Sequence, residues 1–395
     1  MLPPLPGVAD GLDVRPRRLG VAQWFDGHTL RPGDIEISGD VITAVGLPPG
    51  RAGIAAPGFV DLQVNGYRGV DALSSDDDAV AGLRQVLPAT GVTAFALTLI
   101  SAPVADVDRG LARIATIRQT QSRPDARAGA TLLGAHLEGP FLSPRYPGAH
   151  AVEHLLQARP DLVERWLATG ALVAVTLAPE LSGSAEAIMA LTDAGVMVSL
   201  GHCDATGAEA AAAFDRGASA LTHAMNAHRP LVARDPGPLG VALTRPDVVL
   251  MVIADGIHLD PVVLTLLQQA APGRIGLITD SIVASGLGDG TYRYGPIEVT
   301  VAGGKATTAD GRLAGSVATM DTAVRTAALR WGADRALAAA TSVPATLISR
   351  PDLGRLAVGA TADVVVLDDA LVVRRTFCAG RLAHEASGDR TLSTR

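Results

Sequence analysis

Apolar runs alternate with amphipathic stretches over most of the chain. After residue 53 there are eight short, largely apolar runs, at residues 54–60, 92–100, 131–137, 172–177, 196–200, 218–221, 248–254 and 275–279. Helical periodicity fills most of the intervals, at residues 76–87, 104–119, 151–168, 185–194, 208–216 and 261–270, and again at 320–331. This α/β alternation is typical of right-handed βαβ units, and eight units predict a closed (β/α)8 barrel of the TIM type. The run at 218–221 is the weakest, because no clear helix follows it.

The two ends of the chain follow a different pattern. Short strands separated by turns are expected at residues 21–25, 33–38 and 41–45, and again within 359–385. Neither end has enough apolar residues to form a core alone. We therefore expect residues 1–53 and 355–395 to combine into one small β-sandwich domain, beside a barrel formed by residues 54–354.

Composition narrows the class of protein. The 395 residues are 48% hydrophobic and 18% charged, which favours a large core over disorder. A net charge of −7 and the lack of a basic stripe exclude a nucleic-acid partner. Cys203 and Cys378 are too far apart in the chain to form a disulfide framework, and no signal peptide or apolar stretch of membrane-spanning length is found. These features predict a cytoplasmic protein without a membrane segment.

Polar residues stand where the predicted barrel strands end. The first strand carries Asp61, Gln63 and Asn65 at alternating positions, and the third ends in "HLEGP", with His136 and Glu138 directed to one side. Later strand ends contribute His202, His223, Asp255, His258 and Asp280. In a TIM barrel the carboxyl ends of the strands meet at one face, where the catalytic groups gather. The fold therefore predicts one site built from all these positions.

Three of these residues have the chemistry of a metal site. One carboxylate and two neutral imidazoles, from Glu138, His202 and His223, suit Zn²⁺ and leave a coordination position for water. Fe²⁺, Co²⁺ and Mn²⁺ accept the same donors and remain alternatives. Asp280 then has the position of a general base that later protonates the leaving group, and His258 is a second candidate for stabilising the oxyanion.

Each position also has a structural interpretation. A single histidine at a strand end is more often structural than a ligand. Cys203 follows His202 and therefore points to the opposite face of the strand, so we expect it to be a packed core residue. Asp61 is expected to be a local structural acid, and Asp255 to cap the following turn.

The order of the motifs carries a family resemblance. The segments "APGFVDLQVNG", "GAHLEGPF", "SLGHCDAT", "LTHAMNA", "ADGIH", "LITDS" and "LAGSVATMDTAVR" follow one another along the chain. Together they closely resemble the N-acetylglucosamine-6-phosphate deacetylases of the amidohydrolase superfamily, from about residue 50 to "LGRLAVGATADVVVLD". The resemblance implies metal ligands at Glu138, His202 and His223, an acid/base at Asp280, and a homodimer.

The resemblance also implies one metal ion per subunit. Many amidohydrolases have His-x-His on the first strand and hold two metals, whereas this chain has Gln63 and Asn65 there. Amide side chains are poor ligands but good hydrogen-bond partners for a water. The single lysine, Lys305, lies beyond the last strand, where it cannot bridge two metals as a carboxylated lysine.

Substrate-binding residues are likewise implied by the resemblance. Asn226 and Ala227 offer backbone N–H groups to a phosphate, Arg234 pairs with it, and His150 and His258 contact the sugar or the acetyl carbonyl. The chain departs from the family at His228 and Arg229, where "NAMP" is usual, so these two residues either add phosphate contacts or reshape the sugar pocket.

The function expected from these observations is hydrolysis of the acetamide of N-acetylglucosamine 6-phosphate, giving glucosamine 6-phosphate and acetate. One alternative is an amidohydrolase that acts on a different N-acyl amino sugar or related amide. Another is a non-catalytic barrel that serves as a scaffold, which the survival of Glu138, His202, His223 and Asp280 disfavours.

Overall fold

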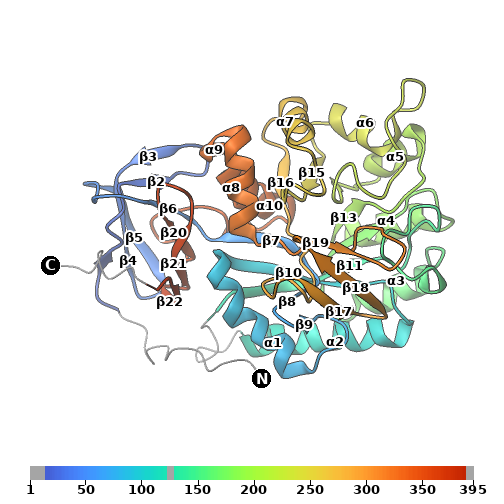
Figure 1. Cartoon of the computed structure of the whole chain (residues 1–395), viewed down its shortest axis with the longest axis horizontal. Coiled ribbons are helices and arrows are strands. Elements are labelled where there is room, and N and C mark those ends of the chain that lie inside the picture. The colour runs from blue at the N-terminus through green and yellow to red at the C-terminus, as the bar shows by residue number, and fades with distance from the viewer. Residues whose placement is uncertain (1–13, 122–128, 388–395) are drawn as a thin grey trace.

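The barrel is the largest part of the computed structural model, which describes residues 14–121 and 129–387 (Figure 1). Its eight strands form one sheet in which every neighbouring pair is parallel. In sheet order they are β7 (Phe59–Val64), β10 (Val92–Ile100), β11 (Thr131–Glu138), β12 (Leu172–Leu177), β13 (Met197–Leu200), β14 (Ala220–Leu221), β15 (Val249–Val252) and β16 (Ile275–Leu277). The predicted (β/α)8 barrel is therefore confirmed.

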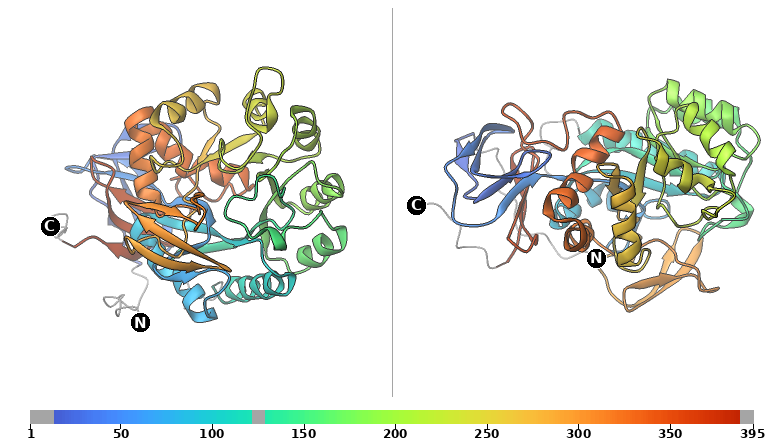
Figure 2. Two further views of the ribbon diagram at one scale, coloured as in Figure 1. Left: turned by 45° about the vertical axis from the view of Figure 1, so that its right-hand side comes forward. Right: turned by 90° about the horizontal axis from the view of Figure 1, so that it is seen from above.

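Helices surround the strands, as the left view of Figure 2 shows. They are α1 (Asp77–Val86), α2 (Val104–Gln121), α3 (Pro160–Leu167), α4 (Ser184–Asp193), α5 (Gly207–Asp215), α6 (Gly237–Thr244), α7 (Pro261–Ala270), α8 (Met320–Trp331), α9 (Ala333–Ala340) and α10 (Ser342–Leu347). Their inward faces are apolar; α3, for example, buries Leu162, Val163 and Trp166. A capping box of Thr206 and Glu209 starts α5. Among the described residues, the short 3-10 helices η1 (Leu87–Thr90) and η3 (Val152–His154) lie in the connections.

Side-chain and loop contacts, rather than a ladder, close the barrel between β16 and β7. The N–H of Asn65 donates to the carbonyl of Ser281 at 2.8 Å. Asp61 on β7 accepts from the hydroxyl of Thr279 at 2.6 Å and from its N–H at 3.2 Å. Asp61 is only 1% exposed, so the expectation of a structural acid is confirmed.

Both ends of the chain contribute to the small β domain on the left of Figure 1. One sheet contains β1 (Arg17–Arg18), β4 (Asp34–Ser38) and β5 (Val41–Leu47), and the other contains β22 (Arg381–Glu385), β21 (Val373–Cys378), β20 (Val364–Leu367), β6 (Ile54–Pro57), β2 (Gln23–Phe25) and β3 (Leu30–Pro32). Ile35, Ile37, Val364 and Phe377 pack between them in one apolar cluster. The domain limits given above stay a prediction, and their outermost residues, 1–13 and 388–395, lie outside the described residues.

The apolar run 54–60 is two strands, so the prediction of a single barrel strand is wrong. β6 pairs with β2 and β20 in the small domain, and the barrel begins at β7. Gly58 separates them, with its N–H bonded to the carbonyl of Asp363. A Cβ at Gly58 would lie 2.0 Å from the Thr93 side chain, so only glycine permits this close crossing.

Two further segments differ from the predictions. The helix expected at 151–168 is the turn η3 followed by α3, which begins at Pro160, because proline starts a helix readily and disrupts its interior. A three-stranded antiparallel sheet was not predicted: β17 (Gly290–Tyr294), β18 (Ile297–Ala302) and β19 (Lys305–Thr307). Figure 2 shows it projecting from one side of the barrel. A small hairpin, β8 (Gly66–Tyr67) and β9 (Val70–Asp71), follows β7.

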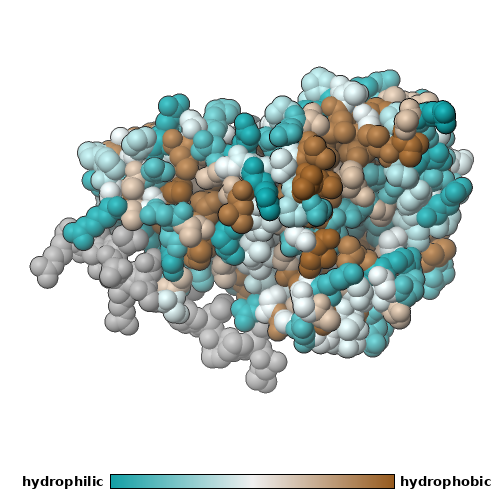
Figure 3. Space-filling view, turned by 45° about the horizontal axis from the view of Figure 1, so that its top comes forward, coloured by the Kyte–Doolittle hydropathy of each residue, from teal (hydrophilic) through white to brown (hydrophobic). Residues whose placement is uncertain are grey.

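Hydrophilic residues separate the apolar areas on the face that Figure 3 displays. Within residues 14–121 and 129–387, no helix combines the length and the apolar composition that crossing a membrane requires.

Candidate active site

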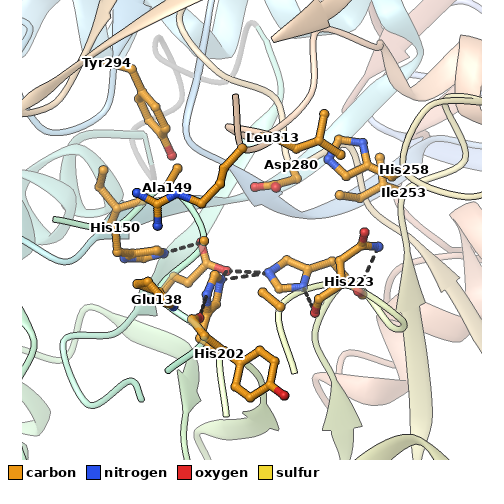
Figure 4. A pocket seen from close by; sticks show the side chains of 18 of the residues that line it. Glu138, Ala149, His150, His202, His223, Ile253, His258, Asp280, Tyr294 and Leu313 are labelled. Carbon is orange, nitrogen blue, oxygen red and sulfur yellow. Dashed lines mark hydrogen bonds and ion pairs between the residues drawn. The ribbon is translucent and has the colours of Figure 1, made fainter. Parts of the chain in front are cut away.

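Glu138, His202 and His223 meet at the carboxyl end of the barrel (Figure 4). Glu138 is the last residue of β11, and the histidines follow β13 and β14 by two residues each. His223 Nε2 lies 3.0 Å from His202 Nε2 and 3.1 Å from Glu138 Oε1, and His202 Nε2 lies 3.4 Å from the same oxygen. All three residues are buried.

Backbone carbonyls define the tautomers of the two histidines. His202 Nδ1 is 2.9 Å from the carbonyl oxygen of Tyr146, and His223 Nδ1 is 3.2 Å from that of Asn226. A carbonyl only accepts, so both Nδ1 atoms carry a proton, and both Nε2 atoms present lone pairs when the imidazoles are neutral. Two nitrogen lone pairs and a carboxylate oxygen then face one another at about 3 Å, an arrangement that a cation satisfies. The donor set therefore fits a divalent metal.

The histidines around Glu138 keep it ionised. Burial alone would raise the pKa of Glu138, but His150, His202 and His223 hold that pKa well below its usual range. His202 and His223 also have positive φ angles, 48° and 30°, a conformation that non-glycine residues adopt rarely and that is concentrated at functional sites.

Asp280 stands opposite the cluster and is held by two amides. Gln63 Nε2 donates to Glu138 Oε1 at 2.9 Å and to Asp280 Oδ1 at 3.0 Å, and Asn65 Nδ2 donates to the same Asp280 oxygen at 2.7 Å. Burial and the charge of Glu138 raise the pKa of Asp280 to about 8. The Asp280 carboxyl can therefore hold a proton near neutral pH.

The carbonyl oxygens of the same two amides are buried. Gln63 Oε1 and Asn65 Oδ1 have no hydrogen-bond partner within the described part of the chain. Buried acceptors without partners are rare and indicate a place for a water or a ligand.

His150 and His258 present opposite chemistry to the site. The N–H of Ser101 donates to His150 Nδ1 at 3.2 Å, so His150 carries its proton on Nε2, which lies 3.7 Å from Glu138 Oε2. His258 Nδ1 instead donates to Asp255 Oδ2 at 2.8 Å. The other Asp255 oxygen accepts the N–H groups of Ile257 and His258, which confirms the predicted cap of this turn.

A cavity of about 360 Å³ opens beside these groups, which is within the range for small-molecule sites. Its lining includes Glu138, His150, His202, His223, Asn226, Ala227, His258 and Asp280, as expected from the sequence. Further lining residues were not singled out there, among them Arg145, Tyr294 and Arg312. Arg145 follows "HLEGP" closely, and inspection of that loop for cations would have found it; Tyr294 and Arg312 belong to the segment after β16 whose sheet was not predicted.

Arg234 does not join the cavity. It is exposed on the loop between β14 and α6 and is absent from the lining. Asn226 lines the cavity, but its backbone N–H is not free for a phosphate, because it already donates to the His223 carbonyl at 2.9 Å. Within the described residues, the Ala227 N–H has no such partner. Of the two backbone N–H groups expected to bind a phosphate, only that of Ala227 is therefore available within the described residues.

His228 and Arg229 brace the loop instead of lining the cavity. His228 Nε2 accepts from the Met225 N–H at 2.9 Å, and burial lowers the pKa of His228 to about 4. Arg229 pairs with Asp204 at 3.1 Å and Asp235 at 3.0 Å. Neither residue lines the cavity, so the geometry lends no support to added phosphate contacts and fits the other alternative, a reshaped pocket wall.

His136, the other ionisable residue of "HLEGP", lies below the cluster and outside the cavity lining. It is fully buried, with Nε2 2.8 Å from the Thr176 hydroxyl and Nδ1 3.3 Å from that of Thr98. Burial lowers the pKa of His136 to about 4, so it is a neutral core residue. Cys203 is also buried, as expected, in a small cluster with Ala178 and Ala205.

A parallel barrel whose strand ends gather a Glu/His/His cluster and an opposing aspartate defines a metal-dependent hydrolase of the TIM-barrel class. The match to known families agrees: the model of the Amidohydrolase family covers residues 54–383. The chain belongs to the amidohydrolase family.

Relatives within this family are similar over most of their length. The N-acetylglucosamine-6-phosphate deacetylase of Bos taurus is 40% identical over 346 residues, covering 83% of both chains. The N-acetylgalactosamine-6-phosphate deacetylase of Escherichia coli O157:H7 is 36% identical and covers 94% of this chain and 98% of its own. The structure of a Mycobacterium smegmatis N-acetyl-D-glucosamine-6-phosphate deacetylase variant, in complex with N-acetyl-D-glucosamine-6-phosphate, superimposes with a TM-score of 0.85 at 34% identity, covering 93% of this chain and 99% of that one.

Proposed function

We propose that this protein hydrolyses the acetamide of N-acetylglucosamine 6-phosphate to glucosamine 6-phosphate and acetate. The observation that carries the proposal is the pairing of an ionised Glu138 with a protonatable Asp280 across one cavity, joined by Gln63. The relatives from Bos taurus and Mycobacterium smegmatis, named for this deacetylation, support it.

Glu138, His202 and His223 would hold one divalent metal ion, with Zn²⁺ as the first choice and Fe²⁺, Co²⁺ or Mn²⁺ as alternatives. Bound there, the ion supplies an activated water and polarises the amide carbonyl. Gln63 and Asn65 favour a single ion, because their side-chain nitrogens already donate to carboxylates. Lys305 lies on β19, outside the barrel, where it cannot bridge a second ion.

Asp280 transfers a proton from the attacking water to the leaving amine. Its Oδ1 is held by Gln63 and Asn65, so Oδ2 is the oxygen that takes a proton from the attacking water. The Asp280 carboxyl keeps this proton until the C–N bond breaks, and Oδ2 then delivers it to the leaving amine. His150 directs Nε2–H toward the reacting end of the cavity, and His258, oriented by Asp255, contacts the sugar.

The phosphate is proposed to bind the Ala227 N–H together with Arg145 and Arg312, which line the cavity. Replacing Arg145, Arg312 or Arg234 singly by glutamine tests these assignments. Removing a true phosphate contact raises KM for the phosphorylated sugar and leaves hydrolysis of the unphosphorylated sugar unchanged. Arg234, outside the cavity, serves as the comparison.

Acetate release from N-acetylglucosamine 6-phosphate, measured with the metal content of the purified protein, tests the function directly. The 36% identical galactosamine relative supports a second candidate, N-acetylgalactosamine 6-phosphate, so both epimers belong in the assay. Turnover of one epimer identifies the sugar. Absence of acetate release from the metal-loaded protein with either epimer would contradict the proposal and favour another amide or the scaffold alternative.

We also propose a cytoplasmic homodimer. Exposed apolar residues flank the loops after β14 and β15 and continue onto α7: Met225, Leu231, Val232, Ile257, Val262 and Leu266. Such residues favour contact with another protein surface. Light scattering of the eluted protein measures the mass, and a mass near 40.4 kDa would contradict the dimer.

A further inference from the structure

Tyr294 lies in the cavity wall, yet the proposed reaction gives it no part. It is the last residue of β17, in the sheet inserted between Asp280 and α8, and pairs with Ile297 of β18 across a tight turn. The insertion thereby places a phenol beside Glu138 and Asp280, although no barrel strand carries it.

The ring of Tyr294 is held in place. It is 4% exposed and belongs to an apolar cluster with Ile100, Ile282 and Val299. The turn after it is anchored, because the Gly295 N–H donates to Asp71 Oδ2 at 3.2 Å. Asp71 is itself fixed, since its other oxygen accepts three hydrogen bonds from the β9–α1 connection. The phenol therefore has a defined direction.

The hydroxyl of Tyr294 points into the cavity. Figure 4 shows it on the side of Ala149 and His150, across from His258. No described residue provides it with a hydrogen-bond partner. Tyr292, two residues earlier, differs: its hydroxyl donates to the Gly288 carbonyl at 3.0 Å, outside the cavity. A hydroxyl that opens onto the cavity without a protein partner is available to a ligand.

The wall around this hydroxyl has the chemistry of an acyl site. Burial, Asp280 and Glu138 raise the pKa of Tyr294 well above its usual value, so the O–H keeps its proton and can donate. His150 lies on the same wall and directs its Nε2–H toward Glu138 Oε2, 3.7 Å away. Ile100 and Ala149 add apolar surface beside the Tyr294 hydroxyl. A donor next to apolar side chains matches a carbonyl oxygen attached to a methyl group.

We propose that the Tyr294 hydroxyl donates a hydrogen bond to the acyl oxygen of the substrate, beside His150, and that this bond strengthens as the oxygen gains negative charge during attack. The inference rests on the proposed function, because amide hydrolysis is what brings an acyl oxygen to this wall.

Tyr294→Phe removes the hydroxyl and keeps the packed ring, and Tyr292→Phe is its matched control on the same strand. A donor that acts on the developing charge affects kcat more than KM. We expect Tyr294→Phe to lower kcat for acetate release on the order of 100-fold, with KM and metal content near those of the wild type. We expect Tyr292→Phe to match the wild type in all three.

Equal kcat values for Tyr294→Phe and the wild type would overturn the inference and leave the proposed function standing. A rise in KM alone, or a loss of metal from Tyr294→Phe, would also overturn it, because either result assigns Tyr294 to ground-state binding or to structure. If the metal-loaded wild type releases no acetate from either epimer, the proposed function fails and this inference fails with it.

Discussion

Two carboxylates that share one amide donor differ in charge because their neighbours differ. Gln63 donates to both Glu138 and Asp280. Three histidines lower the pKa of Glu138, whereas burial and the charge of Glu138 raise that of Asp280. One group thus stays ionised as a ligand, and the other exchanges a proton near neutral pH. Separating paired pKa values in this way assigns acid/base roles within a site.

Asp280→Asn should abolish proton transfer while keeping the site assembled. The amide has nearly the same shape, and its oxygen can still accept from Gln63 and Asn65. We expect kcat to fall by about 10³-fold or more with metal content unchanged. Acetate release and metal analysis of the same preparation measure both. Turnover like that of the wild type would remove Asp280 from the reaction.

Asp61→Asn should change the pH dependence of stability, whereas Asp280→Asn is expected to change turnover. Burial raises the pKa of Asp61 from 3.8 to about 6, so the folded protein binds this proton more tightly than the unfolded chain. Its contribution to stability is complete below about pH 4 and is lost as the pH rises through about 6. An asparagine has no such proton. Between pH 4.5 and 7, the wild type should therefore lose on the order of 2 kcal/mol that the variant keeps.

Thermal unfolding at several pH values measures this difference. Metal content serves as the control, because Asp61 contacts Thr279 and not the ligands. Wild-type and Asp61→Asn curves of Tm against pH that run parallel would refute the assignment.

At the scale of elements, the loop after β11 confines a metal ligand. Gly148 has a φ of +56° and packs against the ring of His202, so that a Cβ would lie 2.7 Å from the Cε1 atom. The Tyr146 carbonyl in the same loop holds His202 Nδ1. Orientation of a ligand by such contacts affects metal affinity about 10- to 100-fold.

Gly148→Ala should therefore weaken metal binding by at least about 10-fold and lower turnover at limiting metal. Gly170→Ala is the control: its φ is +62°, and nothing lies within 4 Å of the added Cβ. It should lose only about 1 kcal/mol of stability, from backbone strain. Metal titration of both variants distinguishes the effects. Equal metal affinities would show that Gly148 does not position His202.

The limits of a strand could be predicted from the sequence where its apolar run is bounded by polar or turn-forming residues. β10 and β12 have the expected limits, because turn residues flank their apolar runs. The break between β6 and β7 could not be found, since residues on both sides are buried and alternation is absent. It results from a close contact between Gly58 and Thr93, which only the folded chain brings together.

The same distinction applies to the candidate site. Glu138 ends a barrel strand, and His202, His223 and Asp280 follow barrel strands, so the barrel topology alone gathers them. Tyr294 reaches the cavity through a sheet whose position depends on the Asp71 contact, and no local pattern encodes that contact.

On the scale of the whole molecule, metal binding and stability are linked. Glu138, His202 and His223 come from three different strands, so the folded protein alone presents them together. A ligand that binds only the folded state stabilises it by about 2.7 kcal/mol at 100 times its Kd.

Removal of the metal with a chelator should therefore lower Tm and stop acetate release, and Zn²⁺ should restore both. Glu138→Gln provides the control, because its weakened site should make Tm insensitive to added Zn²⁺. Calorimetric scans of both proteins, with and without the ion, measure the effect. A wild-type Tm that does not respond to the chelator would contradict a site at this position.

The seam between β7 and β16 has a consequence for synthesis on the ribosome. Glu138, His202 and His223 leave the ribosome well before Asp280. Gln63, on the first barrel strand, is synthesised more than 200 residues before Asp280, to which it donates a hydrogen bond in the folded protein. A growing chain, or a fragment cut before the last strand, would contain the three ligand residues and still lack Asp280, the group that moves the proton. The residues that bind the cation and the residue that performs the chemistry are thus synthesised at different times, and only the finished, folded chain brings them together.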